Sequence, residues 1–263
     1  VEIEDEDSLS ERLNANRAVK PLDAAVIRLP HISNFTDFMP LEQHEMLGIR
    51  YVQRARELGR PDLVILPGTK NTMEDLLWLR QNGLEAAALK LAHAGTPILG
   101  VCGGYQMLGQ TLDDPQGTES GRPMALSGLG LLPTRTVFDA QKRRMQVRAA
   151  AQGELFGRAR LTGYEIHNGR TEVGGAPFCV LEDGTPEGCV NRNVFGTYLH
   201  GLFDSGELTG ALVRMLCARK GISPTQTQLM SMADYRQQQF DLLADGVRQA
   251  LDMGAVYRAI NTA

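Results

Sequence analysis

The sequence contains little cysteine and no motif that pairs cysteines for a metal. Its four cysteines are far apart, and they are Cys102, Cys179, Cys189 and Cys217. A zinc site is not expected, because structural zinc sites draw on closely spaced pairs of ligands. So few cysteines in 263 residues are typical of a reducing compartment, and we expect the protein to be cytoplasmic.

Long apolar runs and an excess of positive charge are also absent. No stretch of about 18 apolar residues occurs, so no transmembrane helix is predicted, and no signal sequence is recognised at the start of the chain. Lysine and arginine total 27 against 31 acidic residues, which gives a formal net charge of −4. This balance gives no support for binding to nucleic acid or to an anionic membrane.

The sequence instead alternates short apolar runs with helical patterns. The apolar runs of strand length lie at 24–29, 49–53, 62–66 and 98–101, and the helical patterns at 72–83 and 84–94. Thr72 is expected to cap the first of these helices, with Asp75 as the reciprocal partner. The rhythm predicts an α/β fold with a mostly parallel central sheet flanked by helices, in which ligands bind beyond the carboxyl ends of the strands.

The second half of the chain is less regular. Strands are expected at 128–132 and 194–199, and a helix at 206–220. The tail has an amphipathic helical pattern, and its apolar face comprises Phe240, Leu243, Val247, Ala250 and Leu251. Packing on the core or docking to a partner would both explain this face, and we expect packing. The chain is accordingly divided into an acidic arm, a main domain and a helical extension packed on it, at 1–20, 21–220 and 221–263.

Cys102 lies in the most informative stretch of the sequence. It follows the apolar run 98–101 and stands between Gly100 and Gly104, just before a helical pattern. A nucleophile between two close glycines at a strand-to-helix corner is typical of a nucleophile elbow. The helix N-terminus behind it favours a thiolate. The alternative is a buried structural cysteine followed by a glycine loop.

A cysteine nucleophile needs a base, and the sequence offers two candidates. His167 and His200 both follow short strands, and His200 has the strand-end position that most resembles that of Cys102. His44 and His93 are expected at the surface. No carboxylate closely follows His200 except Asp204, which we expect to cap the next helix. The residues therefore predict a Cys–His dyad, or a triad whose third member stays unnamed.

Such a pair performs acyl transfer. The thiolate attacks a carbonyl carbon, and backbone N–H groups hold the oxyanion that forms. One N–H group would come from Gly103, which follows the nucleophile. The other would come from Gly68, because a residue without a side chain lets the backbone approach closely.

Several of these motifs together resemble the class I glutamine amidotransferases. They are Gly100-Val-Cys-Gly-Gly-Tyr-Gln106, Leu66-Pro-Gly68 and Tyr198-Leu-His200. Ordinary members carry a glutamate two residues after the histidine, where this chain has Leu202. That departure is similar to the cobalamin-pathway branch. The finer signature resembles the cobyric acid synthase family, in the stretches 29–38, 66–72, 163–171 and 196–203.

The resemblance implies a flavodoxin-like class I amidotransferase fold and the hydrolysis of glutamine. Carried over by position, Cys102 would be the nucleophile and His200 the base, with Gly68 and Gly103 in the oxyanion hole. The resemblance further implies a glutamine pocket lined by Gln106, Tyr164 and His167.

In that family the other half of the polypeptide is an ATP-dependent synthetase that amidates corrin carboxylates. This chain has no Gly-x4-Gly-Lys-Ser/Thr loop. We therefore expect the N-terminal synthetase half, with its ATP and Mg²⁺, to lie outside it, and the acidic arm to be the linker. No cofactor or metal is expected in this chain, and the implied partners are glutamine, the synthetase half and, through that half, the corrin.

Two alternatives remain open. One is a related glutaminase, belonging to a cobyrinate a,c-diamide synthase or to an enzyme that amidates a cell-wall lipid intermediate. The loop from Asn34 to Asp37 favours cobyric acid synthase over these. The other is a non-catalytic scaffold on the same fold, which would require a disabled elbow, whereas Cys102 and His200 are both present.

Overall fold

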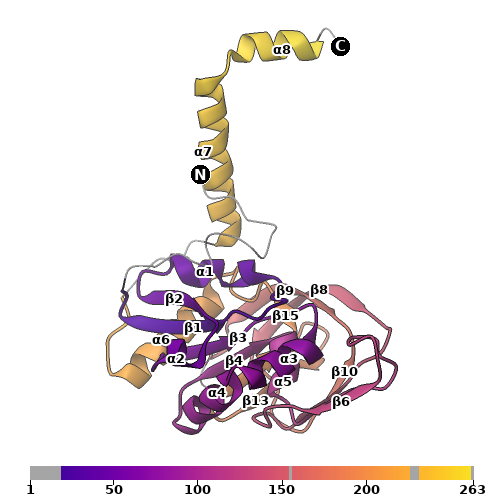
Figure 1. Cartoon of the computed structure of the whole chain (residues 1–263). Helices are drawn as coiled ribbons and strands as arrows, with labels where there is room; N and C mark the ends of the chain where they lie inside the picture. Colours follow the sequence, from indigo (N-terminus) through magenta and orange to yellow (C-terminus); the bar gives the residue numbers. More distant parts are fainter. Residues whose placement is uncertain (1–18, 154–155, 226–230, 262–263) are drawn as a thin grey trace.

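The computed structural model describes residues 19–153, 156–225 and 231–261 (Figure 1). The predicted acidic arm lies outside these residues, apart from Val19 and Lys20. Within the described ranges, no helix is long and apolar enough to cross a membrane.

A six-stranded sheet forms the centre of the molecule, and it confirms the predicted α/β class. Its strand order is β13-β14-β4-β3-β1-β2, and every neighbouring pair is parallel except β13 with β14. In this order the strands are Cys189–Asn191, Val194–Thr197, Ile98–Val101, Leu63–Leu66, Leu22–Ile27 and Leu47–Val52. The central strands read as continuous apolar runs because both of their faces are covered.

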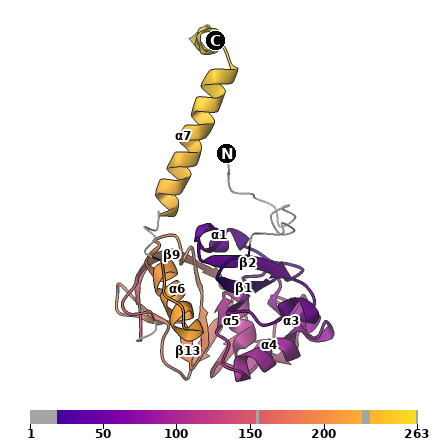
Figure 2. The same ribbon diagram turned by 90° about the vertical axis from the view of Figure 1, so that its left-hand side faces the viewer.

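Helices cover both faces of this sheet. Figure 2 shows α3, α4 and α5 together on one side and α6 on the other. The helices of the body are α1 Met39–Gln43, α2 Ala55–Leu58, α3 Thr72–Gln81, α4 Leu84–His93, α5 Gly103–Leu108 and α6 Glu207–Lys220, and the short 3₁₀ helix η2 is Phe35–Phe38. The helices predicted after β3 and after β14 are therefore present.

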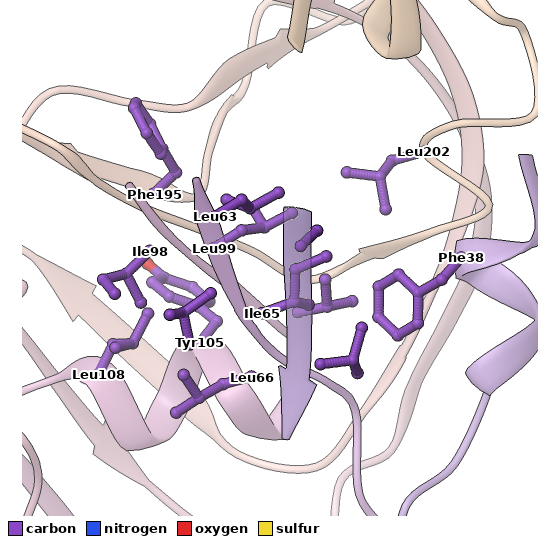
Figure 3. Packing of buried hydrophobic residues seen from close by; sticks show 14 of the residues in the cluster. Phe38, Leu63, Ile65, Leu66, Ile98, Leu99, Tyr105, Leu108, Phe195 and Leu202 are labelled. Atoms are coloured by element: carbon purple, nitrogen blue, oxygen red, sulfur yellow. The ribbon is translucent and has the colours of Figure 1, made fainter. Parts of the chain in front are cut away.

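The core is built around β3 (Figure 3). All four residues of Leu63–Leu66 have no exposed surface, and Phe38 and Leu202 are also fully buried. Burying each such side chain contributes about 1.5–3 kcal/mol before the entropy cost of folding is subtracted. Because Phe38 directly follows Asp37 and Leu202 lies two residues after His200, this packing anchors both of those residues at the carboxyl end of the sheet.

Two smaller sheets, which the sequence did not predict as sheets, occupy most of the second half. One has the order β10-β7-β5-β6, and the other β12-β11-β8-β9-β15. The strands of the first are Arg170–Val173, Thr134–Val137, Thr111–Asp114 and Met124–Ser127. Those of the second are Pro186–Glu187, Cys179–Leu181, Arg143–Ala151, Arg160–His167 and Leu199–His200.

The strand predicted at 128–132 is wrong. This segment is a loop between β6 and β7 that caps the end of α5: the N–H of Leu129 donates to Met107 O, and that of Leu132 to Leu108 O. Gly128 lies against the carbonyl of Gly109, and Gly130 has a φ of 68°. The backbone therefore turns in a segment whose apolar residues suggested an extended strand.

The tail forms two helices, α7 Met232–Ala250 and α8 Met253–Asn261. The helical prediction is right for this segment, but the expected packing of its apolar face on the body is not found. Phe240, Val247 and Leu251 are 51%, 40% and 54% exposed, and Figure 1 shows α7 standing away from the sheet. Hydrophobic periodicity predicts which residues share a face of a helix, but it does not predict which surface that face packs against.

Candidate active site

Cys102 lies at a sharp corner between β4 and α5. Its φ of 52° and ψ of −109° fall outside the regions that non-glycine residues ordinarily adopt, so the turn holds the residue under strain. The corner is stabilised from the neighbouring strand, because the N–H of Cys102 donates to Thr197 O over 2.8 Å. Cys102 is only 8% exposed, and its Sγ lies 3.6 Å from the carbonyl oxygen of Ile166.

The glycines around Cys102 are required by close backbone contact. A Cβ on Gly104 would stand 2.0 Å from Leu66 O, and one on Gly100 would stand 2.8 Å from the backbone of Gly104. Helix α5 therefore approaches the end of β3 more closely than any other residue type would allow.

We expect Gly104→Ala to destabilise the fold by about 3 kcal/mol or more, because the new methyl group meets backbone rather than a movable side chain. Urea unfolding followed by far-UV circular dichroism measures this. The matched control is Gly246→Ala in α7, where a Cβ meets nothing within 4 Å; it should leave the midpoint unchanged or slightly raised. Equal midpoints for the two variants would contradict the close approach.

His200 is brought to Cys102 by a change of sheet. The chain leaves the central sheet after β14 and enters β15, which pairs with β9. The imidazole of His200 is buried, its Nδ1 lies 2.6 Å from Asp37 Oδ2, and it hydrogen-bonds Cys102. Burial alone would lower the pKa of His200, but the hydrogen bonds and charges of Asp37 and Cys102 outweigh it and raise that pKa to about 10.

Asp37 is the site residue that the sequence did not reveal. Its carboxylate is 5% exposed and uses both oxygens on the His200 segment: Oδ2 on the imidazole and Oδ1 on the N–H of Gly201 over 2.9 Å. Asn34, the N-cap of η2, has a φ of 53°, and the buried Phe35 and Phe38 are the first and last residues of the same short helix. The one available signal was that loop, where polar residues alternate with aromatic ones.

His167 is the less suitable of the two candidate bases. Its ring stacks on that of Tyr198 with centroids 3.6 Å apart, and its Nε2 lies 3.8 Å from Glu165 Oε2. Its Nδ1 is buried without a hydrogen-bond partner in the described structure. The imidazole that hydrogen-bonds Cys102 belongs to His200. The geometry therefore favours His200 as the base, and His167 lies in the wall of the site.

A cavity of about 280 Å³ opens over Cys102 and His200. Gln106 and His167 line it, as do Ser33, Thr69, Phe138 and Ile166. Tyr164 is not among the lining residues. It stacks on His200 with centroids 5.3 Å apart and accepts a hydrogen bond from Asn34 Nδ2 over 2.8 Å, so it holds the outer side of the imidazole.

Gln106 lies in the cavity wall, as expected for the predicted glutamine pocket, and its side-chain amide is hydrogen-bonded within the protein. Its Nε2 donates to Asn168 O at 3.1 Å and to the Tyr198 hydroxyl at 3.2 Å, while its Oε1 accepts from Thr72 Oγ1 at 3.0 Å. The side chain is 3% exposed. Its hydrogen bonds link α5 to α3 and to the end of β9.

The two glycines proposed for the oxyanion hole lie on either side of Thr69. A Cβ on Gly68 would stand 3.0 Å from His200 Cε1, and one on Gly103 would stand 2.6 Å from Thr69 Cγ2. In the described part of the chain, neither amide N–H has a hydrogen-bond acceptor. Both are available to an oxygen that develops next to Cys102.

Charged groups stand at the mouth of the cavity. Lys70, Lys142 and Glu119 line it. Glu119 accepts from the N–H of Thr72 over 2.7 Å, and burial raises the pKa of its carboxyl group. The loop is held by Asp114, which accepts the N–H groups of 118, 119 and 120. The arrangement presents one carboxylate and two ammonium groups to a ligand.

A second buried carboxylate, Glu187, fixes the segment that leads to His200. Its Oε1 accepts a hydrogen bond from the N–H of Tyr198, and its Oε2 accepts one from the Thr197 hydroxyl, both with a donor–acceptor distance of 2.7 Å. Thr197 is also the residue whose carbonyl receives the N–H of Cys102. Glu187 therefore stabilises both the turn that carries Cys102 and the segment that leads to His200.

Several local predictions need correction. The N-cap of α3 is Asn71, whose side chain accepts from the N–H of Glu74. Asp75 instead accepts from the N–H and Nδ1 of His31 and from Thr69 Oγ1. His44, expected at the surface, is 5% exposed. All four cysteines are free and buried, and the described residues contain no group of His, Cys, Asp and Glu arranged to hold a metal.

Comparison with known sequences and structures gives a consistent result. Residues 23–208 match the family of CobB/CobQ-like glutamine amidotransferase domains. The chain is 43% identical to a cobyric acid synthase of Ruminiclostridium cellulolyticum, over 99% of this chain and 53% of that protein. It is 44% identical to that of Salmonella typhimurium, over 98% and 53%. The chain therefore spans about half the length of these relatives.

Solved structures support the fold. PurLQS of Thermotoga maritima is similar with a TM-score of 0.57 and 19% identity, covering 77% of this chain and all of that chain. A further glutamine amidotransferase gives a TM-score of 0.53 with 18% identity, over 76% and 99% of the two chains. At this level of identity the likeness extends to the fold, which is that of glutamine amidotransferases.

Proposed function

The chain belongs to the CobB/CobQ-like glutamine amidotransferase family, and from this membership we propose that it is the glutaminase part of a cobyric acid synthase. The observation that carries the proposal is the array of Cys102, His200 and Asp37 under a small cavity. The ammonia it releases would be used by the other half of such an enzyme, for ATP-dependent amidation of the b, d, e and g side chains of adenosylcobyrinic acid a,c-diamide.

The relatives favour cobyric acid synthase over the related glutaminases. Those at 43% and 44% identity are described as cobyric acid synthases and align over nearly all of this chain. We further propose that 21–220 is the catalytic domain, that 221–263 is its extension, and that the enzyme acts in the cytoplasm.

The first half-reaction begins with Cys102 as a thiolate and His200 as an imidazolium. The pKa of about 10 keeps His200 protonated at neutral pH. The sulfur attacks the side-chain amide carbon of glutamine, and the N–H groups of Gly68 and Gly103 hold the oxyanion. His200 gives its proton to the leaving nitrogen, so ammonia departs and a γ-glutamyl thioester remains.

The second half-reaction restores the enzyme. Neutral His200 takes a proton from water, and the hydroxide adds to the thioester carbon. The carbon–sulfur bond breaks, glutamate leaves and the thiolate–imidazolium pair is regenerated. Throughout, Asp37 holds Nδ1 of His200 as a donor, which leaves Nε2 directed at Cys102.

Glutamine recognition follows from the charges at the mouth of the cavity. The substrate carries an ammonium group and a carboxylate on its α-carbon. We propose that Glu119 binds the ammonium group and that Lys70 or Lys142 binds the carboxylate, because these are the charged groups lining the cavity. The expected geometry is a charge-assisted hydrogen bond at each end.

We expect Glu119→Gln to raise KM for glutamine by roughly 10- to 100-fold with little change in kcat, since a hydrogen bond to a charged group contributes about 1.5–3 kcal/mol. Steady-state glutamate production measures both constants. The control is Glu74→Gln on the exposed side of α3, which should match the parent chain. An unchanged KM in the Glu119 variant would remove Glu119 from the substrate site.

The proposal as a whole is tested by a glutamine-analogue electrophile that alkylates the nucleophile of the site. We expect a single adduct, mapped to Cys102 by mass spectrometry, and protection by glutamine. Cys179, Cys189 and Cys217 are buried and serve as internal controls. Absence of the adduct on Cys102 under conditions that label an active glutaminase would support the scaffold alternative.

A further inference from the structure

One face of α7 presents apolar side chains to solvent. Phe240, Leu243, Val247 and Leu251 follow one another at intervals of three or four residues, so they share a face of the helix. They are 51%, 38%, 40% and 54% exposed. Figures 1 and 2 both show α7 directed away from the body, with no other described element beside this part of the helix.

The composition of α7 identifies the kind of surface it suits. Most of the stability of a helix in a protein comes from the packing of its amphipathic face, so the apolar face of α7 needs a cover. The charged residues of α7 are three aspartates and two arginines, Asp234, Arg236, Asp241, Asp245 and Arg248. A helix that binds anionic membranes is rich in lysine and arginine. The mixed charge therefore favours an apolar groove on a protein.

The base of α7 is joined to the catalytic site by hydrogen bonds. The N–H of Met232 donates to Asp204 O over 3.0 Å, and Arg236 lies 3.8 Å from the Asp204 carboxylate. The N–H of Asp204 donates to Gly201 O, and the N–H of Gly201 donates to Asp37 Oδ1. The first turn of α7 therefore lies next to the segment that carries His200, and the apolar face follows further along the same helix.

The lengths of the relatives identify the occupant. The two alignments cover 98–99% of this chain, but only 53% of the length of each relative. Such chains thus carry nearly as much sequence again outside the matched part. We propose that the apolar face of α7 is the docking surface for that other, amidating half, on the helix whose first turn adjoins the His200 segment. The proposal rests on the proposed function, because it assumes that the ammonia has an acceptor domain.

The test compares two variants in a polypeptide that joins both halves, as in the relatives. Phe240→Asp with Val247→Asp disrupts the face, and Leu242→Asp is the matched control, since Leu242 is 52% exposed on the other side of α7. We expect the double variant to lose more than tenfold in glutamine-dependent amidation while amidation with ammonium chloride is unchanged. Leu242→Asp should behave as the parent protein in both assays.

Hydrogen exchange gives a readout that does not depend on glutaminase activity. The amides of α7 should be protected in the joined polypeptide, and exchange at least tenfold faster in the 263-residue chain and in the double variant. Failure to hydrolyse glutamine in the parent protein would end the proposed function, yet this protection would still report docking. Equal protection in all three proteins would overturn the proposal. So would a dimer of the 263-residue chain that the double variant dissociates, because the face would then bind a second copy.

Discussion

Replacing Cys102 by alanine is expected to abolish glutamine hydrolysis, with a loss of roughly 10⁵-fold or more, as for the removal of a nucleophile in other acyl-transfer enzymes. The sulfur forms the bond to the substrate carbon, and alanine provides no nucleophile in its place. Glutamate production under saturating glutamine measures the effect.

The variant should remain folded. Alanine fits the volume of the side chain, and the bond from the N–H of residue 102 to Thr197 O is made by the backbone. The control is Cys217→Ala in α6, which is buried away from the cavity and should keep full activity. Glutaminase activity that survives in the Cys102 variant would refute the thioester mechanism.

Asp37→Asn is expected to lower kcat by about 10³- to 10⁴-fold, the effect seen when a triad carboxylate is replaced by an amide. An amide can present its NH₂ group to Nδ1 and so stabilise the wrong tautomer of His200. It also removes the negative charge that favours the imidazolium. Because Asp37 acts through His200, it is a positioning residue.

The pH dependence of stability separates this role from a merely structural one. The folded-state pKa of His200 is about 10, above its ordinary value of 6.5. The stabilisation from the charged imidazole is therefore complete below about pH 6.5 and is lost as the pH rises through 10. Urea midpoints at pH 7 and pH 10 should fall less steeply in the Asp37 variant than in the parent chain.

The matched control is Asp183→Asn in the surface turn between β11 and β12, which should change neither kcat nor the pH dependence. Should the Asp37 variant hydrolyse glutamine within tenfold of the parent rate, the carboxylate would have no part in the reaction. Asp37→Glu offers a second comparison, since it retains the charge and should recover part of the activity.

The sequence revealed the nucleophile because its environment is local. Gly100, Cys102 and Gly104 lie within five residues of one another. The spacing of the two glycines reflects the close backbone contacts that exclude other residue types at these positions. His200 was accessible for a related reason, because its position follows a strand of the same parallel sheet.

Asp37 could not be found in this way. It meets His200 across 163 positions of sequence, and no periodicity or spacing rule connects two residues so far apart. The search for a carboxylate after His200 identified Asp204, which we expected to cap the next helix. The N-cap of α6 is instead Gly206, and the backbone carbonyl of Asp204 accepts the N–H of Met232 at the base of α7. The pairing depends on η2 folding over the end of the sheet, a tertiary event.

The small sheets of the second half were missed for a different reason. Strands such as β10 and β6 are four residues long and lie at the surface, with mostly exposed or half-exposed side chains. They lack the alternation of apolar and polar residues by which a half-buried strand is recognised. Their pairing is set by hydrogen bonds between segments such as 134–137 and 170–173, which single-segment patterns do not contain.

The most direct measurement is the mass of the Cys102 peptide after the enzyme is mixed with glutamine and quenched in acid. The account predicts a γ-glutamyl group on Cys102 that disappears on treatment with neutral hydroxylamine and is absent from the Cys102→Ala protein. Glutamate formation during the same turnover without any adduct on Cys102 would contradict it.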